Sequence, residues 1–400
     1  MIKNRKQKLE KNFSLIFWSQ AFLTMRMFSI ISTLFFLHRG LGLSQIFYLS
    51  ITWAIVNLLF EIPSSYLADK WGRKKTLIIG ALFNILSWII LIFAKDIYIF
   101  IIAFVFTSLQ YACFSGTTDA LIYDSNKELD KESSSLKRLG NLYSARHLFK
   151  IIGPIIAVLI AKNLSGSQFI AVLILDLMAA TIAFIIITKL TEANHYMDLE
   201  KQEAGVIKDA WKLIKKDWQL IRAILSRVLM FISIFIIWRF HQKFFTNLGI
   251  SIIALGITAA GINLVIFIFN QNIIKFVNPK NLIKKINILN YSITFFLTIF
   301  VVSIFVFPNK YWLLVLYGLI LLPEVARWPL YSELYNKKSF SFNRATTLSL
   351  SNLLKSILDI PLLFIASVLI GINIIYPFML ALVLAIIVII FFRIPKTIKT

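Results

Sequence analysis

Long apolar stretches recur from one end of this chain to the other, and they constrain its fold more than any other feature. They predict helices over 13–37, 44–68, 76–94, 97–123, 140–162, 167–188, 220–245, 250–274, 281–307, 310–335, 345–371 and 374–393. A helix rises about 1.5 Å per residue, so about 20 apolar residues cross a hydrocarbon core about 30 Å thick. Of the 400 residues, 58% are hydrophobic, whereas soluble domains use about 45–50%. The sequence therefore predicts an all-α, polytopic membrane protein with twelve transmembrane helices.

The basic residues agree with this reading. The net charge of +23 would suit a nucleic-acid binder, but the Lys and Arg residues lie in short loops between the apolar stretches. With the predicted helices, 29 of them fall on one side of the membrane and five on the other. Cytoplasmic loops are rich in Lys and Arg. We therefore expect a multi-pass protein of the cell membrane with both termini in the cytoplasm, in contact with lipid and not with nucleic acid.

One polar stretch, 189–219, is longer than the other loops and divides the chain. It predicts an N-terminal six-helix half over 1–188, a cytoplasmic linker over 189–219 and a C-terminal six-helix half over 220–400. Apolar residues recur at helical spacing from Val206 to Trp218 with lysines between them. This pattern is typical of an amphipathic helix that lies on a membrane surface, and a docking site for a partner is the alternative.

The sequence has few of the residues from which enzymes build their sites. The single cysteine, Cys113, lies in an apolar stretch, and the four histidines have no metal-ligand spacing. There is no GxxxxGK[ST] nucleotide motif and no cluster of catalytic side chains. We therefore expect no cofactor, no metal and no catalytic residues, and we do not expect an enzyme.

A charged turn between the second and third predicted helices carries the most specific pattern. The segment from Glu61 to Leu77 reads EIPSSYLADKWGRKKTL, with an acid at Asp69, a glycine at Gly72 and a basic cluster from Arg73. A carboxylate at a helix end can pair with such a cluster or with the N-terminus of a facing helix. Glycine permits the chain reversal, which a residue with a Cβ resists.

This turn resembles the conserved loop of the major facilitator superfamily, Gly-x-Leu-Ala-Asp-Arg-x-Gly-Arg-Lys. Matching residues are Leu67, Ala68, Asp69, Gly72, Arg73 and Lys74, while Lys70 replaces Arg and Ser65 replaces the first Gly. The resemblance implies two six-helix halves that rock about a central cavity, and a gate at the loop. The expected gating residues are Glu61, Asp69, Gly72, Arg73, Lys74 and Arg146.

Further pieces also resemble the family. Ser115-Gly116 and Tyr123-Asp124 close the fourth helix, Gly153-Pro154 lies in the fifth, and Arg344 begins the eleventh. The drug–proton antiporters of the family differ at two places, since this chain has Ala112 instead of an arginine and Ala157-Val158 instead of two glycines.

Ionisable side chains within the predicted helices are candidates for function, because a charge in the membrane is costly. Our substrate and proton candidates are Arg26, Asp119, Arg227, Arg239, Glu324, Arg327, Lys355 and Asp359. Counted along their helices, Glu324 and Lys355 lie near the membrane midplane, where transporters of this kind bind substrates. The alternative is structural pairing, because Glu324 and Arg327 are spaced i,i+3, and Lys355 and Asp359 i,i+4.

These features predict a secondary active transporter that binds a small-molecule substrate and protons and works as a monomer by alternating access. A proton-coupled exporter of amphiphilic or drug-like molecules, an efflux antiporter, is the leading hypothesis, because 36 Phe and nine Trp could line an adaptable pocket. The basic excess among the candidates favours the alternative, an importer of a small polar or anionic solute. A flippase of lipid-linked intermediates is a third possibility.

Overall fold

The computed structural model describes residues 2–131, 135–193, 218–271, 281–338 and 344–395. Its regular elements in these ranges are all helical, as the apolar pattern predicts, and no strand occurs among them. The predicted amphipathic helix of the linker lies almost wholly outside the described residues. The basic run at Asn278–Lys280, where a second copy of the loop motif would fall, lies outside them too.

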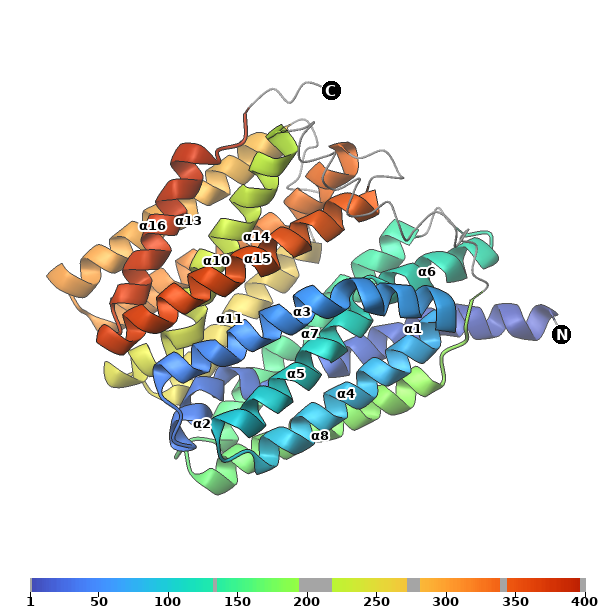
Figure 1. Ribbon diagram of the computed structural model, residues 1–400, viewed down its shortest axis with the longest axis horizontal. Coiled ribbons are helices and arrows are strands. Elements are labelled where there is room, and N and C mark those ends of the chain that lie inside the picture. Colours follow the sequence, from blue (N-terminus) through green and yellow to red (C-terminus); the bar gives the residue numbers. More distant parts are fainter. Residues whose placement is uncertain (1, 132–134, 194–217, 272–280, 339–343, 396–400) are drawn as a thin grey trace. The chain divides into compact units, whose positions relative to one another are not determined.

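The chain separates into two compact units, which are residues 1–199 with 259–263 and residues 200–258 with 264–400. The elements of the first unit are α1 (Ile2–Leu23), η1 (Met27–Ile30), α2 (Ser32–His38), α3 (Leu43–Trp71), α4 (Arg73–Phe93), α5 (Ile97–Phe114), α6 (Thr117–Glu128), α7 (Ser135–Ile160) and α8 (Gly166–Thr188) (Figure 1). The second unit is built mainly from α10 (Trp218–Asn247), α11 (Ile252–Gln271), α13 (Leu282–Val306), α14 (Lys310–Lys338), α15 (Arg344–Ile372) and α16 (Tyr376–Phe391). The predicted boundaries of the halves and the linker stay a prediction.

Many of these helices are long and apolar enough to cross a membrane. Among the described residues nine helices meet that condition alone, and a bent pair over Asn4–Ile30 and Ser32–His38 gives a tenth. Two shorter apolar helices, His147–Ile160 and Tyr376–Phe391, fall on further predicted segments. The chain is therefore a multi-pass membrane protein, and the exact number of twelve spans stays a prediction.

Two predicted helices are not continuous. The sequence predicts one helix over 13–37, but α1 ends at Leu23 and the chain bends by 52° before α2. It also predicts one helix over 97–123, but this stretch is interrupted after Phe114, where Gly116 has φ 72°. Hydropathy could not show the first break, because the residues on both sides of it are apolar.

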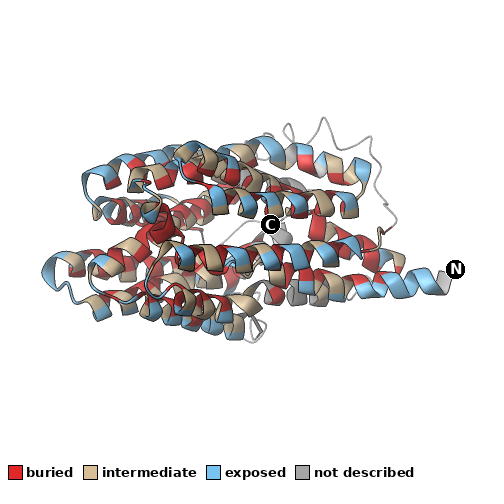
Figure 2. Cartoon of the chain, turned by 90° about the horizontal axis from the view of Figure 1, so that it is seen from below, coloured by how far each residue is buried: buried red, intermediate tan, exposed pale blue. Residues whose placement is uncertain are grey.

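Each unit has its own core. In the first unit the Phe35 ring centroid lies within 6.0 Å of the centroids of Phe28, Phe36, Phe100 and Phe169, and all of these pairs except the tilted one with Phe36 meet edge to face. In the second unit α10 is the most buried helix, and its Phe244 meets Phe300 and Phe378. The first turns of α1, in contrast, are exposed from Asn4 to Lys8 (Figure 2).

Close helix packing in the first unit depends on Gly80 of α4. A Cβ built there would lie 2.8 Å from Cys113 Cβ and 2.8 Å from the Phe114 ring, both on α5. Gly261 of α11 is a matched contrast, because a Cβ there would have no atom within 4 Å.

We therefore expect Gly80→Ala to lower the free energy of unfolding by about 1–3 kcal/mol, because overpacking outweighs the gain in helix propensity. Gly261→Ala should be neutral or stabilising by up to about 1 kcal/mol. Thermal unfolding of the purified protein in detergent, followed by tryptophan fluorescence, measures both. An unfolding midpoint for Gly80→Ala at or above that of Gly261→Ala would show that α4 and α5 do not pack at this glycine.

Candidate functional site

The turn between α3 and α4 is formed by Gly72 alone. Its backbone has φ 101° and ψ 147°, a conformation that residues with a Cβ rarely adopt. A Cβ at this position would also lie 3.0 Å from Glu192 Oε2. Glycine is therefore required here for two reasons, the backbone conformation and the approach of a carboxylate.

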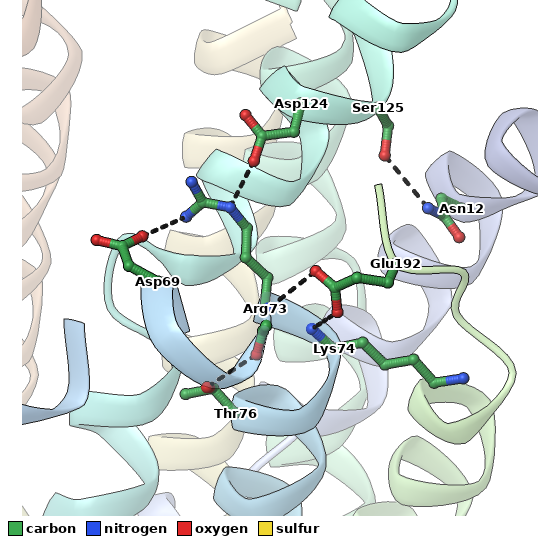
Figure 3. A network of polar contacts seen from close by, with 9 residues as sticks. Asn12, Asp69, Arg73, Lys74, Thr76, Asp124, Ser125 and Glu192 are labelled. Atoms are coloured by element: carbon green, nitrogen blue, oxygen red, sulfur yellow. Dashed lines mark hydrogen bonds and ion pairs between the residues drawn. The ribbon is translucent and has the colours of Figure 1, made fainter. Parts of the chain in front are cut away.

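Arg73, the first residue of α4, joins two other helices through its guanidinium. The side chain is buried; its Nε donates to Asp124 Oδ2 of α6 at 2.6 Å, and its Nη1 lies 3.7 Å from Asp69 Oδ1 of α3. Figure 3 shows the guanidinium between the two carboxylates. A buried guanidinium is stabilised only when such acceptors are present, so Asp69 and Asp124 together hold α3, α4 and α6 at this end of the unit.

A second carboxylate contact comes from the segment after α8. Glu192 accepts the backbone N–H of Arg73 at 2.9 Å and that of Lys74 at 2.8 Å. These N–H groups have no partner within α4, and the helix dipole there favours a negative charge. Lys74 takes part through its backbone, while its side chain points away from the carboxylate (Figure 3). The carboxylate thus ties the chain that leaves α8 to the N-terminus of α4.

The first helix is bound to the same segment. The Asn12 amide donates to Thr191 O at 2.8 Å and to Ser125 Oγ at 3.2 Å, and its Oδ1 accepts the Thr191 N–H at 2.9 Å. Arg5 adds a contact with the Glu128 carboxylate at 2.5 Å. We call Asn12, Asp69, Gly72, Arg73, Asp124 and Glu192 the loop network.

The remaining expected gating residues take other positions. Glu61 is half-buried on α3, and its Oε2 accepts a hydrogen bond from Asn57 at 3.4 Å. Arg146 belongs to α7, but its side chain lies outside the described part of the structure. Asp119, one of the proton candidates, lies half-buried in the first turn of α6.

In the second unit, Glu324 and Arg327 of α14 form a buried ion pair. Arg327 Nη1 also donates to Asn290 Oδ1 of α13 at 2.9 Å. The Asn290 amide continues to Ser226 Oγ at 3.1 Å, and that hydroxyl lies 3.0 Å from Tyr331 Oη. The other carboxylate oxygen, Glu324 Oε1, is buried and accepts no hydrogen bond from the residues that the structure describes.

A second pair lies on α15, where Lys355 Nζ donates to Asp359. The Lys355 ammonium also lies 4.9 Å from the centre of the Phe231 ring of α10. Arg227 of α10 lies 4.3 Å from the Trp328 ring of α14, and Phe231 and Trp328 meet edge to face at 5.8 Å. Two cations therefore flank one aromatic pair, which is a favourable arrangement for charge in an apolar setting.

The last two candidates are arginines with no acid at helical spacing in the sequence. Arg239 is buried on α10. Arg26 lies between α1 and η1 with an exposed side chain, and its Nη2 donates to Gln110 Oε1 at 3.2 Å. This contact does not follow from sequence spacing.

Several partners in these sites could not be found from the sequence. The contacts of Glu192, Asn12 and Asn290 lie more than 30 positions away along the chain. The sequence indicates only that a polar group at a helix end or within a span needs a hydrogen-bond partner, and not which residue that partner is. Among the described residues, no group of three His, Cys, Asp or Glu side chains could hold a metal ion.

We expect Glu192→Gln to lower the free energy of unfolding by about 1–2 kcal/mol, because an amide has one acceptor atom for two N–H groups and no charge for the helix dipole. Glu10→Gln is the control, since Glu10 binds Lys131 and Arg138 at the surface, where ion pairs contribute about 0–1 kcal/mol. Thermal unfolding in detergent measures both variants. An equal decrease in the free energy of unfolding in Glu192→Gln and Glu10→Gln would show that Glu192 contributes no more than a surface charge.

Comparison with known proteins agrees with this architecture. The model of the Major Facilitator Superfamily matches residues 16–358. An uncharacterised MFS-type transporter of Bacillus subtilis (strain 168), YxaM, is 25% identical over 236 residues, which are 58% of this chain and 58% of that protein. This chain thus spans less than two thirds of the length of that relative.

Solved structures show the same fold. A mutant of the nucleoside transporter NupG superposes with a TM-score of 0.77 at 13% identity, covering 96% of this chain and 98% of that one. A D-xylose–proton symporter gives 0.73 at 13% identity, covering 97% of both chains. A peptide transporter, POT, gives 0.68 at 14% identity, covering 94% of this chain and 93% of that one. With the family model matched over most of its length, this chain belongs to the Major Facilitator Superfamily, and the relatives named above are transporters, not enzymes.

Proposed function

We propose that this protein is a proton-coupled transporter, that it moves a small polar solute, and that Glu324 carries the proton. The observation that supports the proposal is the buried Glu324–Arg327 pair, whose carboxylate has one oxygen on the guanidinium and one without a hydrogen bond from the described residues. A proton on Glu324 would compete with Arg327 for the carboxylate. Protonation would then leave Asn290 as the remaining hydrogen-bond acceptor of Arg327 among the described residues, and this change could bias α14 between two positions.

The choice of a polar solute follows from the charges and from the relatives. Arg227 and Lys355 lie beside the aromatic pair Phe231–Trp328, so this surface combines cations with rings. The solved relatives carry nucleosides, D-xylose with protons, and peptides, as their names state. These solutes are polar, which supports uptake of a small polar solute over export of a drug-like one.

Export of amphiphilic molecules is the second candidate. It is favoured by a row of rings on α10, where Phe231, Phe235 and Trp238 follow one another with centroids 5.8–6.0 Å apart. Proteoliposomes with an imposed proton gradient separate the two candidates. Gradient-driven uptake of a nucleoside, D-xylose or a dipeptide supports the first, and gradient-driven movement of a lipophilic cation alone supports the second.

We expect Glu324→Gln to abolish accumulation against a gradient while downhill exchange continues, because the neutral amide fixes one protonation state. Removing one member of a buried ion pair costs about 3–5 kcal/mol, so the double variant Glu324→Gln/Arg327→Gln is measured beside it. The double variant should recover thermal stability but not accumulation.

Asp359→Asn is the matched control on the neighbouring helix, because Asp359 is likewise paired with a cation on its own helix. If Asp359→Asn loses accumulation and Glu324→Gln keeps it, the proton site is on α15. If Glu324→Gln also stops downhill exchange while remaining folded, Glu324 binds the solute itself.

The orientation in the cell membrane is also a proposal, and it follows from the basic loops. Both termini and the linker should face the cytoplasm, with the loop network at the cytoplasmic end. In a Cys113→Ser background, Lys310→Cys should react with a membrane-impermeant thiol reagent on intact cells, and Lys201→Cys only after permeabilisation. Labelling of both sites on intact cells would contradict this orientation.

A further inference from the structure

The break in the first span is held by one carboxylate from α8. Where α1 ends, the N–H groups of Met27 and Phe28 are not bonded within a helix, and they donate instead to Asp176 Oδ1 at 2.9 Å and Oδ2 at 2.8 Å. Asp176 is buried. Irregular backbone at membrane depth is tolerated only where other groups satisfy it, so this carboxylate takes the place of the carbonyl acceptors that a continuous helix would have supplied.

The break places Arg26 in an unusual conformation. Its backbone has φ 35° and ψ 56°, in the left-handed region that an arginine rarely adopts. The neighbouring turn is fixed from a second side, because a Cβ on Gly153 of α7 would lie 3.1 Å from Met25 O. Asp176 and Gly153 therefore determine where the Arg26 side chain leaves the backbone.

The guanidinium of Arg26 has spare hydrogen-bonding capacity. Its only hydrogen bond to the described residues is the one to Gln110, a neutral acceptor, although a guanidinium carries five N–H donors. Asp176 interacts with it electrostatically, but both carboxylate oxygens already accept backbone N–H groups. The Arg26 side chain is exposed and lies near Tyr111, whose ring meets Trp53 edge to face at 5.1 Å.

We propose that this break is a binding site for an anionic group of the transported solute, a carboxylate or a phosphate, with Arg26 as its ligand and Asp176 as the positioning residue. A planar guanidinium binds such groups through two parallel hydrogen bonds. The rings of Tyr111 and Trp53 provide an apolar surface beside the charge. The proposal rests on the proposed function and refines it by giving the polar solute a negative group, but its test does not require transport.

The test measures the electrostatic preference of the site in the purified protein. Tyr111→Cys, in a Cys113→Ser background, is labelled separately with a negatively charged and a positively charged methanethiosulfonate reagent. The measured ratio is the labelling rate with the negatively charged reagent divided by the rate with the positively charged one. We expect Arg26→Gln to lower this ratio by about tenfold, because the variant removes one nearby cation. Lys162→Gln, at an exposed residue just beyond the end of α7, is the control and should leave the ratio unchanged.

Asp176→Glu tests the positioning role, because it keeps the negative charge but moves the two acceptor oxygens away from the N–H groups of Met27 and Phe28. It should lower the same ratio although Arg26 and the carboxylate charge are both still present. A merely structural role would change both labelling rates together and leave their ratio as it was.

Competition then identifies the anion. Sodium phosphate or sodium acetate should slow labelling of Tyr111→Cys at an ionic strength where sodium chloride does not, and Arg26→Gln should remove this protection. Protection by phosphate alone indicates a phosphate group on the solute, and protection by acetate alone indicates a carboxylate. An unchanged ratio in Arg26→Gln, or labelling that neither anion slows, would overturn the proposal even if proton-coupled transport is confirmed.

Discussion

A backbone N–H or C=O group without a partner is costly in hydrocarbon, and this constraint governs how the chain can depart from regular helix. Where the first span breaks, the two N–H groups released by the break are bound by Asp176. At the turn between α3 and α4, the N–H groups of Arg73 and Lys74 are bound by Glu192. Both solutions use a single carboxylate from a segment distant in sequence, placed where a helix begins.

The two carboxylates differ in what they make possible. Glu192 ties the end of α8 to the turn at Gly72, and Arg73 extends the connection to Asp124 and Asp69. These contacts connect α3, α4, α6 and the segment after α8 at one end of the first unit. Asp176 instead stabilises an irregular backbone within the span, and irregular backbone at this depth is where transporters bind ions and solutes.

The second unit uses its charges differently. Among its described residues two ion pairs form within single helices, Glu324 with Arg327 and Lys355 with Asp359. Such pairs neutralise themselves without fixing the distance between helices, whereas contacts such as Arg327 to Asn290 do join helices. A proton on Glu324 would weaken its contact with Arg327 within α14 and leave the contact between Arg327 and Asn290 of α13. This exchange of contacts is a physical basis for coupling protonation to helix movement.

The sequence by itself determined the class of fold, the membrane location and the family, because hydropathy, loop charge and the turn at Asp69–Lys74 are local properties of the chain. The i,i+3 and i,i+4 pairs were also predictable, since helix geometry alone brings them together. The breaks after Leu23 and Phe114 and the partners Asn12, Asp124, Asp176, Glu192 and Asn290 were decided only by the tertiary structure. Each of these contacts joins helices distant in sequence, and an apolar stretch looks the same whether its helix is continuous or is interrupted by a carboxylate from another helix.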